Sequence, residues 1–250
     1  MSNTRYGIGV SREQYIRERL FSDLEQLNLD FLEIVPDVCY SQPNGSVSQI
    51  DAVLVCDFGV YCLEFKSWQG VIYPSPSDKW AVNKTTNEGV SKYVTYFPNP
   101  VSQNAGHRAM LLKLILKQVP KVMMEKIENY VLNPGWAKFD IYNVVIFDDQ
   151  RSLLDFRYFD KVPRNIVTSS SAINYIKNKQ LGHKISVGTL ECKWIVDFLK
   201  YLRGVNKPIF DEAHKRTILK SGLEVESYMS KEELLASPFY RSYKERKGTK

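Results

Sequence analysis

Two short apolar runs on either side of a turn constrain the fold of this chain more than any other feature. The runs cover residues 49–56 and 60–66, and apolar residues make up most of each run. They are joined by Asp57-Phe58-Gly59, in which the glycine permits a tight turn. Apolar segments that approach a turn from both sides predict a β-hairpin.

Charged residues interrupt the apolar character of this hairpin at one end. Asp51 lies on the first strand, and Glu64 and Lys66 lie at the end of the second. Residues two apart in a strand point to the same face, so Glu64 and Lys66 project together, and we expect Asp51 to face them. Buried charges are rare unless they are paired or bind metal. A carboxylate and an amine in one cleft would suit phosphodiester cleavage.

The spacing Asp-x12-Glu-x-Lys does not by itself decide between a site and a surface feature. Glu-x-Lys occurs in many proteins, and the same residues can form a modest cross-strand ion pair on a solvated strand face. The neighbouring strand residues are apolar, which favours an enclosed cleft or a strand terminus.

Several motifs in a fixed order carry a resemblance to a known family. They are Gln49-Ile50-Asp51, the segment 57–70, Trp80 and Pro98-Asn99-Pro100-Val101-Ser102-Gln103-Asn104. This set resembles the NERD, or nuclease-related, domain of the PD-(D/E)xK nuclease-like superfold. The resemblance covers residues 7–148, and more loosely the segment to about 203. It implies an α/β fold with a central mixed β-sheet flanked by helices, a restriction-endonuclease-like core and a C-terminal helical or basic extension.

The resemblance also implies roles for individual residues. Asp51 and Glu64 would hold a divalent metal, Mg²⁺ or Mn²⁺, and Lys66 would be the catalytic lysine. The backbone carbonyl of Phe65 could add an oxygen ligand, since hard cations prefer oxygen. Gln103 would be the glutamine of the following helix, where it could position Lys66 or a phosphate oxygen.

Glu13 is the candidate for the family's first motif, although a glycine is expected where this chain has Ser11-Arg12. Ile16, Leu20 and Leu24 follow Glu13 at three, seven and eleven residues, which predicts a helix that buries one stripe. We therefore assign Glu13, rather than Glu18, to bind a metal water or a second ion. The alternative is that both glutamates pair with arginines on the helix surface, and for Glu18 this is favoured.

Basic residues suggest where nucleic acid would bind, although a net charge of +6 is mild for that purpose. His107 lies four residues after Gln103 and either contacts phosphate or borders the helix interface. A row of lysines, spaced four residues apart, follows Gln103 in the sequence, and a basic cluster occupies the last ten residues. The candidates are Lys113, Lys117, Lys121, Arg241, Lys244, Arg246 and Lys247. Such rows can follow a phosphate backbone, but they are also typical of the solvated face of an amphipathic helix.

Composition bounds the organisation of the chain. With 250 residues and 44% hydrophobic content, it can bury a full core, and we expect one domain at 1–203 and a charged extension at 204–250. No apolar run has the length of a membrane span and no signal peptide opens the sequence, which indicates the cytoplasm and no membrane partner. The four cysteines show no paired spacing, which argues against structural zinc.

The expected elements follow from periodicity and turn residues. They are a helix at 11–27 with Ser11 as N-cap, strands at 31–35 and 141–147, a sheet extension at 71–73, a loop or hairpin at 74–96, and helices at 101–117, 120–130, 170–178 and 188–203. Beyond Gly204, Asn206-Lys207-Pro208 predicts an interruption.

The principal hypothesis is therefore a metal-dependent nuclease, with DNA as the expected substrate. The alternative keeps the fold without catalysis, as a nucleic-acid-binding or scaffold module in a larger assembly. A pure binding role gives no reason to hold two carboxylates near a polyanion. A protein partner or a homo-oligomer remains open.

Overall fold

The computed structural model describes residues 5–27, 29–56, 59–86, 89–118, 141–182 and 189–221. Its centre is a five-stranded mixed sheet in the order β1-β2-β3-β7-β9. The strands are β1 (Leu32–Ser41), β2 (Val47–Cys56), β3 (Gly59–Lys66), β7 (Ile141–Phe147) and β9 (Ile166–Thr168). The first three pair antiparallel, and β7 and β9 add in parallel.

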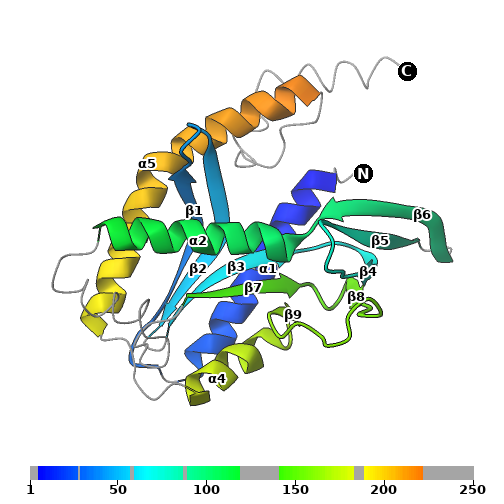
Figure 1. Ribbon diagram of the computed structural model, residues 1–250, viewed down its shortest axis with the longest axis horizontal. Helices are drawn as coiled ribbons and strands as arrows, with labels where there is room; N and C mark the ends of the chain where they lie inside the picture. Colours follow the sequence, from blue (N-terminus) through cyan, green and yellow to red (C-terminus); the bar gives the residue numbers. More distant parts are fainter. Residues whose placement is uncertain are drawn as a thin grey trace.

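Helices cover both faces of this sheet (Figure 1). One face packs against α2 (Pro100–Gln118) and α5 (Thr189–Ser221), and the other against α1 (Arg5–Glu25) and α4 (Ala172–Gly182). Side chains of β3 alternate between the two layers: Val60 and Cys62 join the α2 and α5 side, whereas Tyr61 and Leu63 join the α1 and α4 side. The expected α/β fold is thus confirmed.

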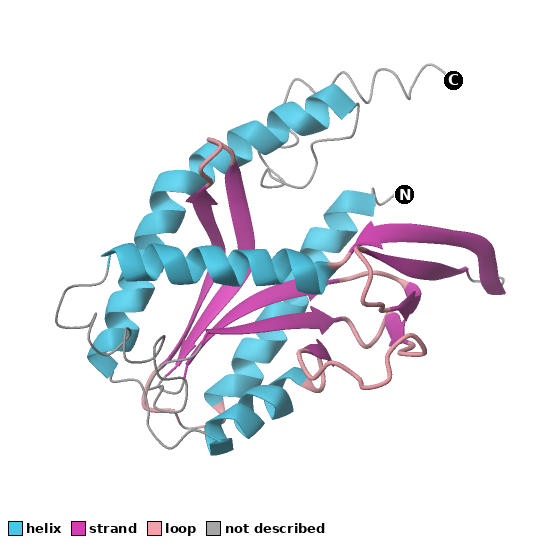
Figure 2. Cartoon of the chain, viewed as in Figure 1, coloured by secondary structure: helices cyan, strands magenta, loops and turns pink. Residues whose placement is uncertain are grey.

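A second mixed sheet in the order β6-β5-β4-β8 stands at one end of the first (Figure 2). It consists of β4 (Gly70–Tyr73), β5 (Lys79–Thr86), β6 (Gly89–Pro98) and β8 (Ser152–Leu154). The prediction that 71–73 extends the main sheet is therefore wrong. Gly70, with φ of 115°, turns the chain away after β3. The excursion at 74–96 is a hairpin, and its Trp80 packs on Phe147 of the main sheet.

Two expectations about helix ends are also wrong. The first helix begins at Arg5, so Ser11 lies inside it and is not its N-cap. α5 does not stop at Asn206 but continues through Pro208 to Ser221. Asn206 is buried, its amide donates to the Leu202 carbonyl at 2.9 Å, and it accepts a bond from Ser41 Oγ at 2.8 Å. α5 thus crosses residue 204, where the charged extension was expected to begin. The helix expected at 120–130 lies outside the described residues.

The β2–β3 hairpin is confirmed, although its turn residues Asp57 and Phe58 lie outside the described residues. Its two strands pair only from Ala52–Leu63 to Cys56–Gly59. The first half of β2 pairs with β1 alone, and this ribbon rises beyond the rest of the sheet (Figure 1). The end of β3, from Glu64 to Lys66, therefore has no ladder partner on the β2 side in the described part of the chain.

Candidate active site

Asp51, Glu64 and Lys66 lie where β2 and β3 separate. By strand alternation they point to the face that α2 covers. Asp51 is the first residue beyond the last β2–β3 pair, and its Oδ2 accepts the Phe65 N–H at 2.9 Å. Glu64 is 1% exposed, and its Oε1 forms an ion pair with Lys66 Nζ. The structure thus brings these three predicted residues together.

The neighbouring strand is irregular at the same level. Asp37 of β1 has φ of 53°, between the regular pairs Pro36–Ala52 and Val38–Ile50. A left-handed conformation is unusual for a residue other than glycine, and such strain tends to gather at functional sites. The Asp37 carboxylate accepts a bond from Gln49 Nε2 at 2.7 Å.

Glu13 reaches this cluster from α1, on the other side of the sheet. Ser67 Oγ, just past β3, lies 3.5 Å from Glu13 Oε1. The adjacent Arg12 fixes this part of α1, because its Nε lies 2.6 Å from Oδ2 of Asp148. Asp148 directly follows β7, and its N–H donates to the Lys66 carbonyl at 3.1 Å. The carboxylate of Glu13 therefore approaches around the end of β3.

Burial and mutual repulsion raise the pKa values of the carboxyl groups. Burial raises the pKa of Asp51 to about 7, with a further contribution from the Glu64 charge. Burial, and then the charge of Asp51, raise the pKa of Glu13 to about 7. The Glu64 pKa is also raised, mainly by burial. Three acids in one place are thus poised to accept positive charge.

Lys66 supplies that positive charge in the described structure. Burial lowers its pKa, but the charges of Glu64 and Asp51 outweigh this, so the net effect is a raised pKa. The ammonium group therefore stays charged at neutral pH, in spite of being largely enclosed.

α2 packs over the strands that carry these groups, and two asparagines fix the position of this helix. Asn99 caps its start, accepting the N–H of Val101 at 2.9 Å, and Pro100 occupies the first helical position. The buried Asn104 amide donates to the carbonyls of Cys62 and Val144, at 2.9 and 3.0 Å, and so ties α2 to β3 and β7.

His107 follows one turn after Gln103 on this anchored helix. Its Nδ1 lies 2.9 Å from Tyr40 Oη, and its Nε2 is buried without a hydrogen-bond partner among the described residues. Burial, together with the Lys66 charge, lowers the His107 pKa to about 4. The imidazole is therefore neutral at physiological pH.

A cavity of about 810 Å³ lies beside these groups, and Glu13 and Glu64 are not among its lining residues. Four of the predicted site residues line it, namely Asp51, Lys66, Gln103 and His107. The other lining residues are Tyr40, Gln42, Val47, Ser48, Gln49, Gly106, Met110, Phe210 and His214. The cleft expected from the hairpin is therefore present.

The carboxylates of Glu13, Asp51 and Glu64 are the candidates to hold a metal. Glu64 Oε2 is buried and has no hydrogen-bond partner within the described residues. In the same part of the chain, no group of three or more His, Cys, Asp or Glu side chains is arranged so that it could hold a metal ion. In this arrangement the Lys66 ammonium pairs with one Glu64 oxygen, and the Phe65 N–H donates to one Asp51 oxygen.

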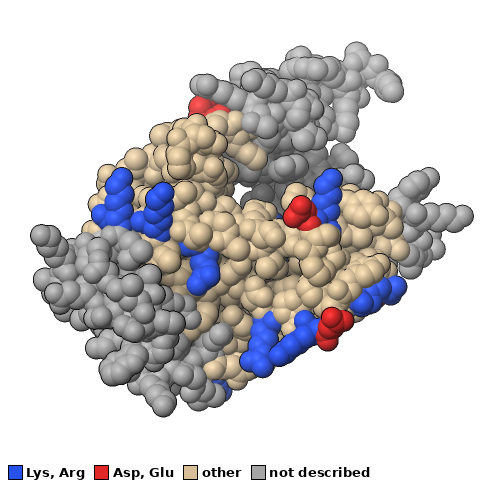
Figure 3. Space-filling view, in the orientation of Figure 1, with Lys and Arg blue, Asp and Glu red and all other residues tan. Residues whose placement is uncertain are grey.

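Of the lysines and arginines predicted to contact nucleic acid, two lie in the described part of the chain. Lys113 and Lys117 are exposed on α2, and at helical spacing they continue the side that carries Gln103 and Met110, beyond the cavity. Figure 3 shows that the described part of this face carries more Lys and Arg than Asp and Glu. The remaining candidates, Lys121, Arg241, Lys244, Arg246 and Lys247, lie outside the described residues.

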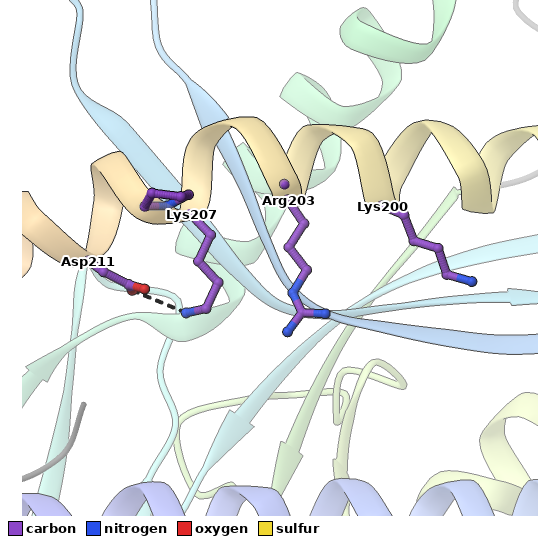
Figure 4. Close-up of a pocket in the computed structure, with 6 residues that line it drawn as sticks. Lys200, Arg203, Lys207 and Asp211 are labelled. Carbon is purple, nitrogen blue, oxygen red and sulfur yellow. Dashed lines mark hydrogen bonds and ion pairs between the residues drawn. The ribbon is translucent and has the colours of Figure 1, made fainter. Parts of the chain in front are cut away.

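A second hollow, of about 400 Å³, runs along α5 and is basic (Figure 4). Its cations already have carboxylate partners. Lys200 pairs with Glu33, Arg203 lies 3.8 Å from Asp37, and Lys207 lies 3.1 Å from Asp211. The contacts of Lys200 and Arg203 link α5 to β1 at the surface and leave the hollow with little unpaired charge.

Sequence reasoning missed several residues around the site. The position of Asp148 could have been noticed in the sequence, because it directly follows an apolar strand. Its contact with Arg12 could not, because the two residues are 136 positions apart. Tyr40, Phe210 and His214 line the cavity without any motif that marks them.

The chain is a mixed α/β protein whose sheets and flanking helices are consistent with a nuclease-like core. The model of the nuclease-related domain, NERD, matches residues 12–147, which is more than half of the chain. The chain therefore belongs to the NERD family, and the resemblance drawn from its motifs is confirmed.

Other comparisons add little about function. An uncharacterized protein of Bacillus anthracis is 31% identical over 81 residues, which make up 32% of this chain and 35% of that protein. The match thus spans about a third of that relative. No solved structure matches the chain. Among the described helices, none has both the length and the hydropathy needed to cross a membrane.

Proposed function

We propose that this protein is a metal-dependent nuclease that hydrolyses phosphodiester bonds, with DNA as its expected substrate. The observation that carries the proposal is the convergence of Glu13, Asp51, Glu64 and Lys66 at the end of β3, beside an open cavity. Membership of the nuclease-related family supports it.

The donor set fits a hard divalent cation such as Mg²⁺ or Mn²⁺. Such ions prefer carboxylate and carbonyl oxygens. Asp51 and Glu64 would hold the ion, the Phe65 carbonyl could add a ligand, and Glu13 would act through water or at a second ion. The buried Glu64 Oε2, without a partner in the described residues, is the observation that favours this use. When bound, the cation supplies Lewis-acid chemistry, neutralising phosphoryl charge and promoting deprotonation of water.

The other residues would then act on the substrate. Lys66 is a compact cation whose charge can stabilise negative charge as it develops on the phosphoryl group. Gln103 can donate to a phosphate oxygen or orient Lys66. Neutral His107 can donate from Nε2 if the Tyr40 hydroxyl donates to Nδ1, because the imidazole then carries its proton on Nε2.

The alternative is a catalytically silent nucleic-acid-binding or scaffold module. Its difficulty is electrostatic, since the burial and repulsion that raise three carboxyl pKa values work against folding and against a polyanion. A metal-binding catalytic site gives those charges a use.

A cytoplasmic location accompanies the proposal. All four cysteines fall in the described residues and are buried thiols rather than disulfides. Reducing compartments maintain cysteines in this state.

The test is cleavage of plasmid, linear duplex, single-stranded DNA and RNA, with Mg²⁺, Mn²⁺ or chelator. We expect metal-dependent cleavage that Glu64→Gln abolishes and Lys66→Ala slows by roughly 10²-fold, with metal binding largely kept in the lysine variant. Glu33→Gln, which alters a carboxylate on β1 outside the cavity, is the matched control and should cut normally.

Undiminished cleavage by Glu64→Gln would place the chemistry elsewhere. If the folded wild type binds nucleic acid but cuts none of the four substrates with either metal, the silent module is the better account.

A further inference from the structure

The cavity has an aromatic and apolar side in addition to its acidic end. Phe210 and His214 of α5 line it together with Met110 of α2 and Tyr40 of β1. The rings of Phe210 and His214 stack, with centroids 5.7 Å apart and an interplanar angle of 12°. The same cavity is thus lined by a pair of stacked aromatic rings and by groups proposed to act on phosphate.

This aromatic side is built on a fixed element. Phe210 follows Pro208 inside α5, and the hydrogen bond from Ser41 Oγ to Asn206 ties this part of the helix to the end of β1. The i,i+4 ion pair between Lys207 and Asp211 spans the same turn. Both rings lie beyond residues 12–147, so they belong to a region outside the family match.

The charge of the cavity limits what it can bind. Among its lining residues in the described structure, Lys66 is the sole lysine or arginine, Asp51 is acidic, and other polar lining residues such as Gln42 and Ser48 are neutral. A surface that follows the two backbones of a duplex relies on many cations. Here the binding energy must come largely from stacking and from hydrogen bonds to polar edges.

We infer that the cavity takes an unpaired nucleotide of a single-stranded segment or end, with its base stacked on Phe210 and its phosphate toward Lys66. The inference rests on the proposed nuclease function and specifies its substrate class. The volume lies within the range of about 300–1,000 Å³ typical of pockets that enclose one small ligand. In a duplex, neighbouring base pairs cover the faces of each base, so Phe210 could not stack on them.

The test measures binding with chelator present, so that no metal-dependent cleavage occurs. Fluorescence anisotropy of the full chain is recorded with a labelled single-stranded DNA, an RNA of the same sequence and a blunt duplex. We expect at least one single strand to bind about 10-fold more tightly than the duplex. Phe210→Ala should weaken single-strand binding about 10-fold, because base–aromatic stacking contributes on that scale.

Two further variants control for folding. Ile209→Ala changes an exposed neighbour on α5 that does not line the cavity, and should bind as wild type. Phe210→Tyr retains an aromatic face and should also bind normally. Equal or tighter binding of the duplex, or a folded Phe210→Ala variant with unchanged affinity, overturns the inference. Because binding is read without cleavage, these outcomes are independent of whether the protein proves to be a nuclease.

Discussion

Single residues at the end of β3 are held in an arrangement that favours ligand binding over stability. Three carboxylates share the site with one lysine, and each carboxyl pKa is raised. Without a further cation, full ionisation leaves excess negative charge in a poorly solvated place. A bound divalent ion would relieve this, since it binds the folded state and supplies the missing positive charge.

The raised pKa of Asp51 predicts a pH-dependent gain from Asp51→Asn in metal-free protein. Below about pH 4 the acid is protonated in both folded and unfolded states, so its charge costs nothing. Between about pH 4 and its folded pKa of about 7, the unfolded state loses the proton first, and wild-type stability falls as pH rises. The stability advantage of Asp51→Asn should therefore grow across this range and level off above it.

Denaturant unfolding at several pH values, with chelator, measures this difference. Taking the difference between the two proteins cancels the opposite contribution of His107, whose lowered pKa makes stability rise with pH between about 4 and 6.5. Added Mg²⁺ at pH 8 should then stabilise the wild type and leave the variant nearly unchanged. A stability difference that is constant with pH would show that Asp51 does not titrate as described.

At the scale of elements, the sequence pattern predicted those helices and strands that form from a regular local spacing of apolar residues. Apolar periodicity located the β2–β3 hairpin, the strand β7 and the helix α2, because each buries a regular set of side chains. It misplaced β4, which pairs in parallel with β8 about 80 residues later. A four-residue strand carries no mark of such a distant partner. The pattern also predicted an interruption at Pro208, but α5 continues across this residue, where packing and the Asn206 contacts support the helix.

The Arg12–Asp148 ion pair links α1 to the end of β7, and we predict that it stabilises the site as a unit. Asp148 is 1% exposed, whereas Arg12 is 26% exposed. Arg12→Gln would leave a buried carboxylate without its cation and should lower the free energy of unfolding by roughly 2 kcal/mol. The double variant Arg12→Gln/Asp148→Asn should recover part of that loss, because no unpaired charge remains.

Urea unfolding of the wild type, both single variants and the double variant gives the coupling energy. Arg157→Gln is a suitable control, since its ion pair with Asp155 is exposed and should contribute little. If Arg12→Gln costs no more than Arg157→Gln, the pair does not hold α1 in place. The position of Glu13 would then depend on the apolar stripe of α1 alone.

For the whole molecule, the site exists because the β1–β2 ribbon leaves the sheet where β3 ends. Two-residue periodicity was enough to place Asp51, Glu64 and Lys66 on one face. It could not show that Glu13 comes around from the opposite layer, or that α5 returns to the cavity with Phe210. Those contacts join segments that are far apart in sequence, and only the packing of complete layers brings them together.

The overall charge of +6 is the remaining whole-molecule property, and its use can be measured. Deleting residues 241–250 removes Arg241, Lys244, Arg246, Lys247 and Lys250 and a single glutamate. If these residues contact phosphates, duplex binding should weaken, and the slope of log affinity against log salt should become shallower by about 0.9 per lost contact. For a single strand the change is about 0.7 per contact. Anisotropy titrations over a series of KCl concentrations give both slopes.

Two double variants test whether other basic groups of the chain also contact phosphates. Lys113→Gln/Lys117→Gln removes exposed cations that continue from the cavity along α2, and should also make the slope shallower. Lys200→Gln/Arg203→Gln removes cations that already face carboxylates on β1, so it should change the slope less. Equal changes for both double variants would mean that net charge, rather than position, governs binding. An unchanged slope after the deletion would exclude residues 241–250 from the phosphate contacts and leave the lysines of α2 as the candidates.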